Sequence, residues 1–168
     1  MVKQAEEFEI PFIEDILLDA VYWMEKNGLQ NLWNESNVKW SNLRNSYKIT
    51  DFYISYQNGE PAACMALTDY DPIHWPDIPK GESLYLHKLA VKREYAGKGC
   101  SRELIDFAKA LSYKNAISSI RLNCNGQRTK LREVYEKEGF ICEEEKTLSD
   151  KYVIALYIHR TDNSNLLT

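Results

Sequence analysis

The chain has 168 residues, of which 44% are hydrophobic and 27% are charged. This length and composition are typical of one globular domain with a substantial core, and they exclude a disordered chain. The formal net charge is -4 and no segment is rich in lysine or arginine, so nucleic acid is not an expected partner.

The distribution of residues excludes two further classes of protein. No apolar run is long enough to span a membrane, and the N-terminal segment is acidic rather than signal-like. The four cysteines are scattered without a C-x-x-C pair, and the three histidines lack metal-ligand spacing. We therefore expect a cytoplasmic protein with reduced thiols, without a metal ion and without membrane association.

Hydrophobic periodicity predicts two helices and a β-hairpin in the first part of the chain. Apolar residues recur at helical spacing from Ile13 to Met24 and then alternate from Phe52 to Tyr56. Asn58-Gly59 is a typical hairpin turn. The expected elements are a helix over 13–24, a shorter helix over 36–45, and strands over 52–56 and 61–68.

The second part of the chain alternates strands and helices after a long loop. These elements are a loop over 69–81, a strand over 84–91, a helix over 101–113, a strand over 117–123, a helix over 127–138, and strands over 140–145 and 152–159. Two strand–helix units followed by two strands imply a mixed sheet covered by helices on both faces. We expect a single domain over 1–160 and a polar tail over 161–168. A ligand of such a sheet is expected at the carboxyl end of a central strand.

The most informative segment joins the predicted strand over 84–91 to the helix over 101–113. A helix N-terminus presents free backbone N–H groups and the positive end of the helix dipole. Gly97 and Gly99 allow the backbone to approach a ligand and to adopt positive φ. Arg93, Lys98 and Arg102 add positive charge. Together these features predict an anion site, with phosphate as the expected anion, and a purely structural glycine turn is the alternative.

Two short motifs follow one another in this half of the chain. The first is Leu89-Ala90-Val91 followed by the loop Ala96-Gly97-Lys98-Gly99-Cys100-Ser101. The second is a helix ending in Tyr135, followed after three residues by Gly139-Phe140. In this order they resemble the GNAT superfamily of acetyl-CoA-dependent N-acyltransferases, with two departures from the signature loop, at Ala96 and Ser101. The departures are tolerable if backbone amides bind the ligand, because amides do not depend on the side chain.

The resemblance implies a fold and a cofactor site. The implied fold is α/β (α+β), a mixed, mostly antiparallel twisted sheet of six to seven strands with about four helices on both faces. Acetyl-CoA is the implied cofactor, without a metal ion. Ser101 is also a candidate N-cap of the helix, and Arg128 stands where the family often has an asparagine. The implied cofactor-binding residues are Leu89, Ala90, Val91, Ala96, Gly97, Lys98, Gly99, Cys100, Ser101, Arg102 and Arg128.

Acetyl transfer to an amine needs a base, because an ammonium group cannot attack, and an acid for the leaving thiolate. His87, in the strand beside the loop, is the first base candidate, and Glu82 is the second. Tyr135 is the acid candidate, because the family places this hydroxyl near the thioester sulfur. Structural alternatives exist, since His87 can hydrogen-bond on the sheet surface and Tyr135 can fill the core. A β-bulge in the strand over 89–91 would free an N–H for the thioester carbonyl.

Residues that bind the acceptor are expected in the loop over 69–82 and next to it. Its aromatic and carboxylate side chains suit a cationic amine through cation–π contact and charge, and an ordinary solvated loop is the alternative. Alternation places Tyr85 and His87 on one face of their strand. Cys124 is expected to be a buried small residue rather than a nucleophile. The substrate-binding candidates are Trp33, Tyr85, Asp71 and Trp75.

The predicted function is that of an N-acetyltransferase, in which the acetyl group of acetyl-CoA moves to a primary amine by direct attack in a ternary complex. The expected partner is a small-molecule amine, and the family implies a monomer or a homodimer. One alternative is a non-catalytic acyl-CoA-binding or regulatory domain that keeps the loop but loses the acid and base. Another is an unrelated phosphate-binding domain, but the glycines are not followed by the lysine and serine or threonine of a P-loop.

Overall fold

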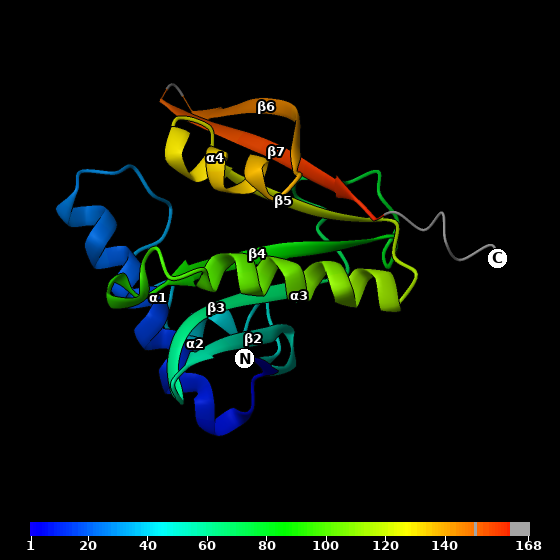
Figure 1. The fold of residues 1–168 in the computed structure, drawn as a ribbon. Coiled ribbons are helices and arrows are strands. Elements are labelled where there is room, and N and C mark those ends of the chain that lie inside the picture. Colours follow the sequence, from blue (N-terminus) through cyan, green and yellow to red (C-terminus); the bar gives the residue numbers. More distant parts are fainter. Residues whose placement is uncertain (150, 162–168) are drawn as a thin grey trace. The chain divides into compact units, whose positions relative to one another are not determined.

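The structure, a computed structural model, describes residues 1–149 and 151–161 of the chain (Figure 1). Most of the tail expected over 161–168 therefore lies outside the described residues. The chain divides into two compact units. Unit 1 comprises Met1–Leu67 and Lys88–Phe107, and unit 2 comprises Thr68–His87 and the chain from Ala108 onward.

The helices and strands follow the predicted order closely. The α-helices are α1 (Ile10–Lys26), α2 (Trp40–Leu43), α3 (Cys100–Lys114) and α4 (Thr129–Lys137). The strands are β1 (Val2–Gln4), β2 (Phe52–Gln57), β3 (Glu60–Thr68), β4 (Ser83–Val91), β5 (Ser119–Asn125), β6 (Ile141–Ser149) and β7 (Tyr152–Arg160). Short 3-10 turns lie at Glu7–Glu9, Ile49–Asp51 and Arg93–Tyr95.

The strands form a mixed sheet in the order β1-β2-β3-β4-β5-β7-β6. The pairs β1–β2, β2–β3, β5–β7 and β6–β7 are antiparallel, whereas β4 and β5 are parallel. The predicted α/β class with a mostly antiparallel sheet and four helices is therefore confirmed. No helix among the described residues is long and apolar enough to cross a membrane.

In unit 1, strand β2 carries a helix on each of its faces. Phe52 and Ile54 are buried in the core that α1 lines with Ile13, Ile16 and Leu17. The alternate residue Tyr53 lies with its ring centroid 5.0 Å from that of Phe107 on α3. Period-two alternation therefore buries β2 on both sides. The β2–β3 hairpin turns at Asn58 and Gly59, whose φ values of 51° and 83° are those of the predicted two-residue turn.

In unit 2, strand β7 is packed on both of its faces. Leu156 packs with Trp75 and Tyr85, which come from the loop after β3 and from β4. On the other face, Tyr157 packs against α4, where its ring centroid lies 6.3 Å from that of Tyr135. Strand β5 pairs with β7 along its whole length, from Ser119 to Asn125.

Two expectations about the first part of the chain are wrong. The helix expected over 36–45 is only the four-residue α2. The side chain of Asn34 accepts the N–H groups of Ser36 and Asn37, and that of Asn37 accepts the N–H of Asn34. Such side-chain bonds compete with helix formation, so a turn replaces the first part of the expected helix. The second error is the omission of β1, which has three residues and is too short to show a period.

Candidate active site

The predicted anion loop lies in unit 1, between β4 and α3. Gly97 and Gly99 have φ values of 74° and 81°, and a Cβ atom built on either would meet no atom within 4 Å. The backbone at both glycines is therefore open to a ligand. The N–H of Glu103 donates to the carbonyl of Gly99 at 3.0 Å, and α3 begins at Cys100. Ser101 consequently lies inside the first helical turn, and the prediction that it is the N-cap is wrong.

Helix α1 fixes the start of this loop. Nζ of Lys92 lies 2.5 Å from the Asp15 carboxylate, and the Arg93 N–H donates to the carboxylate of Asp19 at 2.8 Å. The guanidinium of Arg93 lies 4.0 Å from the ring centroid of Trp23. Arg93, Lys98 and Arg102 are all exposed, but Arg93 contacts α1, whereas Nζ of Lys98 lies 5.2 Å from the ring centroid of Tyr95 within the loop. The loop therefore presents three exposed cations, of which Arg93 is the one held by α1.

The other predicted cofactor-binding residues of unit 1 differ in exposure. Ala90 and Cys100 are buried, and burial raises the pKa of the Cys100 thiol. Arg102 lies 3.8 Å from the carboxylate of Asp106. The half-buried residues are Leu89, Val91 and Ser101, and the exposed ones are Ala96, Gly97, Lys98 and Gly99. This loop offers a ligand its backbone N–H groups and the cations Lys98 and Arg102.

Strand β4 is distorted at Lys88, next to the predicted base. Lys88 has a φ of 54°, a left-handed conformation that is uncommon for a residue other than glycine. This conformation lies one residue before 89–91, and the β-bulge expected there stays a prediction. Nζ of Lys88 lies 4.9 Å from the ring centroid of Trp33, and burial lowers the pKa of this amine. Trp33, a predicted substrate residue, thus contacts a cation of the chain itself.

In unit 2, the predicted base His87 lies beside a buried carboxylate. Nε2 of His87 is 3.8 Å from Oδ2 of Asp71, and Nδ1 of His74 is 3.1 Å from the same oxygen. Asp71 is 6% exposed. Burial alone would raise the pKa of Asp71, but the hydrogen bonds from His74 and the charges of His74 and His87 outweigh burial and lower it. The loop after β3 therefore gives β4 an ionised carboxylate flanked by two imidazoles.

The remaining predicted residues of this region separate into a buried and an exposed group. Trp75 and Tyr85 are buried, with ring centroids 5.3 Å apart, and they line the inner side of the loop. Tyr85 and His87 both face this loop, as alternation predicts. Glu82 is exposed, and its carbonyl accepts a hydrogen bond from Ser118 at 3.1 Å. Glu82 therefore lacks the packing that surrounds His87.

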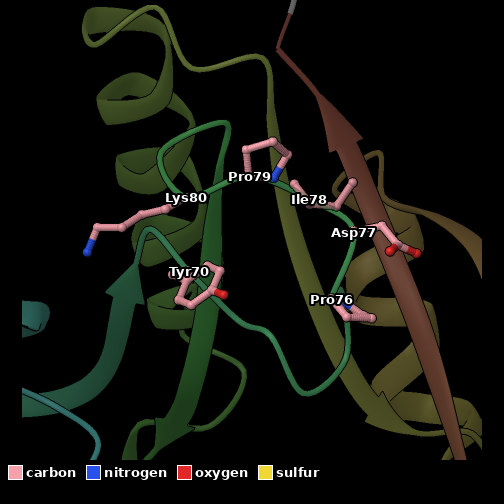
Figure 2. Close-up of a pocket in the computed structure, with 6 residues that line it drawn as sticks. All are labelled: Tyr70, Pro76, Asp77, Ile78, Pro79 and Lys80. Atoms are coloured by element: carbon pink, nitrogen blue, oxygen red, sulfur yellow. The ribbon is translucent and has the colours of Figure 1, made fainter.

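The outer side of the same loop is hollowed into an open pocket (Figure 2). Lys80 there lies 3.4 Å from the carboxylate of Asp69, and the N–H of Gly81 donates to the Asp69 carbonyl at 2.9 Å. The lining residues are Tyr70, Pro76, Asp77, Ile78, Pro79 and Lys80. None of the four substrate-binding candidates lines it, because Asp71 and Trp75 point inward.

The predicted acid Tyr135 is buried between α4 and β7. Its ring lies 6.1 Å from that of Phe140 and 6.3 Å from that of Tyr157. Burial, followed by the nearby Cys124 thiol, raises the pKa of this phenol, whereas Arg128 acts in the opposite direction. Burial also raises the pKa of Cys124 to about 11, which agrees with a small core residue that does not act as a nucleophile. Tyr135 accordingly keeps its proton at neutral pH.

Comparison with known proteins decides the family. The sequence pattern of the acetyltransferase (GNAT) domain matches residues 26–155 of the chain. The chain belongs to the GNAT acetyltransferase family. It is therefore an N-acetyltransferase, the enzyme class predicted from the two motifs.

Relatives of this acetyltransferase agree with the assignment. YesJ of Bacillus subtilis (strain 168), an uncharacterized N-acetyltransferase, is 28% identical over 141 residues, covering 76% of this chain and 74% of that protein. A GNAT-family acetyltransferase from Listeria monocytogenes 4b F2365 has a TM-score of 0.74 at 22% identity, covering 95% of this chain and 94% of that one. YncA from Salmonella typhimurium, solved with its cofactor acetyl-CoA, has a TM-score of 0.73 at 14% identity, covering 97% and 94%. At these identities the structural likeness shows a shared fold.

The acetyltransferase also contains residues that sequence reasoning missed. Arg132 donates from Nε to the Tyr157 hydroxyl at 2.8 Å, and that hydroxyl donates to Glu136 at 2.7 Å. His74 was not predicted to contact Asp71, although an aspartate three residues before a histidine in a loop is compatible with such a turn. No group of histidine, cysteine, aspartate or glutamate within residues 1–149 and 151–161 is arranged to hold a metal ion.

Proposed function

We propose that this acetyltransferase moves the acetyl group of acetyl-CoA directly to a primary amine of a small molecule, in a ternary complex. The observation that carries the proposal is the loop before α3, where Gly97 and Gly99 adopt positive φ and leave open space. N–H groups at the start of a helix lack intrahelical partners and favour anions. The pyrophosphate of coenzyme A is an anion of the right kind for this loop.

The fit of acetyl-CoA rests on the side chains around the loop as well. Lys98 and Arg102 are exposed cations at the start of α3. Arg128, which precedes α4 in the other unit, is a further candidate for the phosphates by the family resemblance alone. Glu103 is the one acid of the first turn, and its carboxylate accepts the Ser55 hydroxyl at 2.5 Å, so it is engaged with β2. PaiA N-acetyltransferase of Thermoplasma acidophilum, solved in complex with coenzyme A, has this fold with a TM-score of 0.73 at 15% identity, covering 95% of this chain and 98% of that one.

The acceptor enters as an ammonium ion and must lose a proton before it attacks. An alkyl amine has a pKa of roughly 10, so little free amine exists at neutral pH. In the proposal, His87 takes this proton, and Glu82 with a bridging water is the alternative base. Overall, the ammonium ion and the thioester give an amide, free coenzyme A and one released proton.

Tyr135 is the proposed acid for the departing thiolate. Its phenol is buried and keeps its proton, because burial raises its pKa. A protonated donor next to the sulfur would prevent a free thiolate from accumulating. Acetyl-CoA supplies the activated thioester carbonyl. The chain binds the phosphates with the loop before α3, and His87 and Tyr135 carry out the two proton transfers.

Three further predictions accompany the proposal. We expect a cytoplasmic location, a monomer or a homodimer, and a single folding domain over 1–160. Each rests on composition or on the family and is tested by fractionation, by sedimentation and by the cooperativity of unfolding, respectively.

The decisive experiment measures release of free thiol from acetyl-CoA against a panel of amines. The panel contains aliphatic and aromatic primary amines, amino acids and peptides with a free N-terminus. The proposal predicts thiol release that depends on one class of small amine, together with one acetylated product per thiol. Acetylation of peptides alone, or release that no primary amine stimulates, would contradict the small-amine acceptor.

A further inference from the structure

A single carboxylate oxygen contacts two histidines on the inner side of the loop after β3. Oδ2 of Asp71 lies 3.1 Å from Nδ1 of His74 and 3.8 Å from Nε2 of His87. The first distance is that of a hydrogen bond, whereas the second is too long for one. Asp71 thus holds His74 directly and faces His87 as a charge.

The backbone of the loop fixes this carboxylate in place. Oδ1 of Asp71 accepts the N–H groups of Ile73 and His74, both at 3.2 Å, and the Asp71 carbonyl accepts the N–H of Trp75 at 3.0 Å. The ring of Trp75 then packs on Tyr85, two residues before His87 on β4. A turn closed by its own aspartate is therefore anchored to the strand that carries the proposed base.

We propose that Asp71 is a positioning residue for His87, and that His74 shares the same carboxylate oxygen. This inference rests on the proposed function, in which His87 takes the proton of the acceptor. A proton passes from the substrate ammonium to the neutral His87 ring, and the products of this step are the free amine and an imidazolium. No other bond changes in the step.

The geometry favours the charged form of His87 over the neutral form. At 3.8 Å a neutral ring gains little from Asp71, but an imidazolium is attracted to the carboxylate in partly buried surroundings. Protonation of His74 would neutralise part of that attraction, because both rings contact the same oxygen.

Charged side chains on the neighbouring elements include Arg121 on β5, Glu82 before β4, and Asp77 and Lys80 in the loop. Arg121 on β5 and Glu82 before β4 both act on the Tyr85 phenol, and burial raises the pKa of that phenol, so it stays neutral. Arg121 forms a 2.9 Å ion pair with Glu143. Lys80, in the same loop, lies 3.4 Å from the carboxylate of Asp69. Asp71 lies within 4 Å of both histidines, and it is the carboxylate on which the inference rests.

The test is an NMR titration of the three histidines in protein labelled with 13C and 15N at histidine. It needs no cofactor and no acceptor, so its result is independent of whether the proposed acetyl transfer is observed. His159 is an internal control, because alternation along β7 places it on the opposite face from Leu156, where its ring lies 5.4 Å from that of Phe140. His74→Gln and His87→Gln assign the resonances.

Asp71→Asn is the informative variant, since asparagine keeps an oxygen for the two loop N–H groups and removes the charge. We expect the pKa of His87 to fall by about 1 unit in Asp71→Asn, with His159 unchanged. In His74→Gln the pKa of His87 should rise, because the Asp71 carboxylate then interacts with one imidazole ring instead of two. These opposite shifts are not expected of a residue that only closes a turn.

A titration of His87 that is unchanged in both variants would overturn the inference, as would shifts of the same sign. Once an acceptor is known, the acidic limb of kcat/KM should move to lower pH in Asp71→Asn and to higher pH in His74→Gln. Failure to bind acetyl-CoA or to acetylate any amine would count against the proposed function and would leave the histidine titration interpretable.

Discussion

The rings of Tyr135 on α4 and Tyr157 on β7 lie 6.3 Å apart, and the hydroxyl of Tyr157 accepts a hydrogen bond from Arg132 at 2.8 Å. Arg132 also donates to the carbonyl of Gly126 at 3.0 Å and to Glu145 at 2.5 Å. Helix α4 is therefore tied to the strands on which it packs, through the helix face next to the proposed acid. The position of Tyr135 depends on these contacts as well as on its own packing.

Removal of the Tyr135 hydroxyl tests its role as the acid. Tyr135→Phe should bind acetyl-CoA as the wild type does and lower kcat by about ten- to a thousandfold, as expected for loss of a general acid. Stopped-assay turnover and calorimetry measure the two effects. Tyr53→Phe, which alters a half-buried tyrosine on β2, is the control and should keep full turnover. Wild-type turnover in Tyr135→Phe would mean that the phenol only packs, or that product release limits the rate.

Loss of Arg132 should reduce stability more than loss of an exposed arginine. Arg132→Met removes hydrogen bonds to a hydroxyl, a carbonyl and a carboxylate, so we expect the free energy of unfolding to fall by about 1 to 3 kcal/mol. Arg160→Met is the control, because Arg160 is 76% exposed and lies 3.6 Å from Glu143, and such surface pairs contribute roughly 0 to 1 kcal/mol. Urea denaturation that gives equal losses for the two variants would contradict the role assigned to Arg132.

The ionisation of Asp71 should make stability depend on pH in acid. Burial by itself would raise the pKa of the Asp71 carboxyl. The contacts with His74 and His87 outweigh burial and hold this pKa below its ordinary value of 3.8. A folded-state pKa below the unfolded one adds stability that is complete above the unfolded pKa and is lost as the pH falls through the folded pKa. The wild type should therefore exceed Asp71→Asn in unfolding free energy at pH 5.5, and the difference should shrink toward pH 3. Equal differences at both pH values would show that the charge of Asp71 does not stabilise the fold.

The pH dependence of turnover separates the two base candidates. If His87 is the base, log kcat/KM should rise with pH through an apparent pKa of roughly 6 to 7.5. His87→Gln should remove this limb and slow the reaction near neutral pH, with partial recovery at higher pH as free amine accumulates. Glu82→Gln should keep the limb, since Glu82 is exposed and its side chain lies outside the Asp71 cluster. An unchanged profile in His87→Gln would assign the proton to water or to Glu82.

Local signals in the sequence predicted most of the secondary structure. The Asn58-Gly59 turn was predictable because two adjacent residues must adopt positive φ there, and asparagine with glycine tolerates that conformation. Helix α1 was predictable from its period, and the boundaries of the longer elements moved by only a few residues. Strand β1 was not predictable, because three residues are too few to show the alternation of a strand.

The candidate site was predictable only in part. The glycines of the anion loop lie in one continuous segment, so the sequence shows them directly. The contact of Asp71 with His87 depends on the path of an irregular loop, and no local propensity determines where such a loop returns to a strand. The same holds for Arg132 and Tyr157, which are far apart in sequence and meet only after α4 packs on β7.

The anion loop can be tested by a change at a single glycine. Gly99→Val places a branched side chain at a φ of 81°. The valine fills the open space through which the ligand would reach the backbone N–H groups of the loop. The matched control is Gly59→Val, at a φ of 83° in the β2–β3 turn, where a Cβ atom likewise meets nothing within 4 Å. Both variants carry similar backbone strain, so their folding should be affected alike.

Calorimetric titration of the wild type, Gly99→Val and Gly59→Val with acetyl-CoA measures directly whether this loop binds the cofactor. The loop before α3 is proposed to bind the pyrophosphate, so Gly99→Val should lose at least about tenfold in affinity, equivalent to roughly 1.4 kcal/mol, while circular dichroism shows that it remains folded. Gly59→Val should bind as the wild type does. Equal affinity in all three proteins would contradict the assignment of the pyrophosphate to this loop.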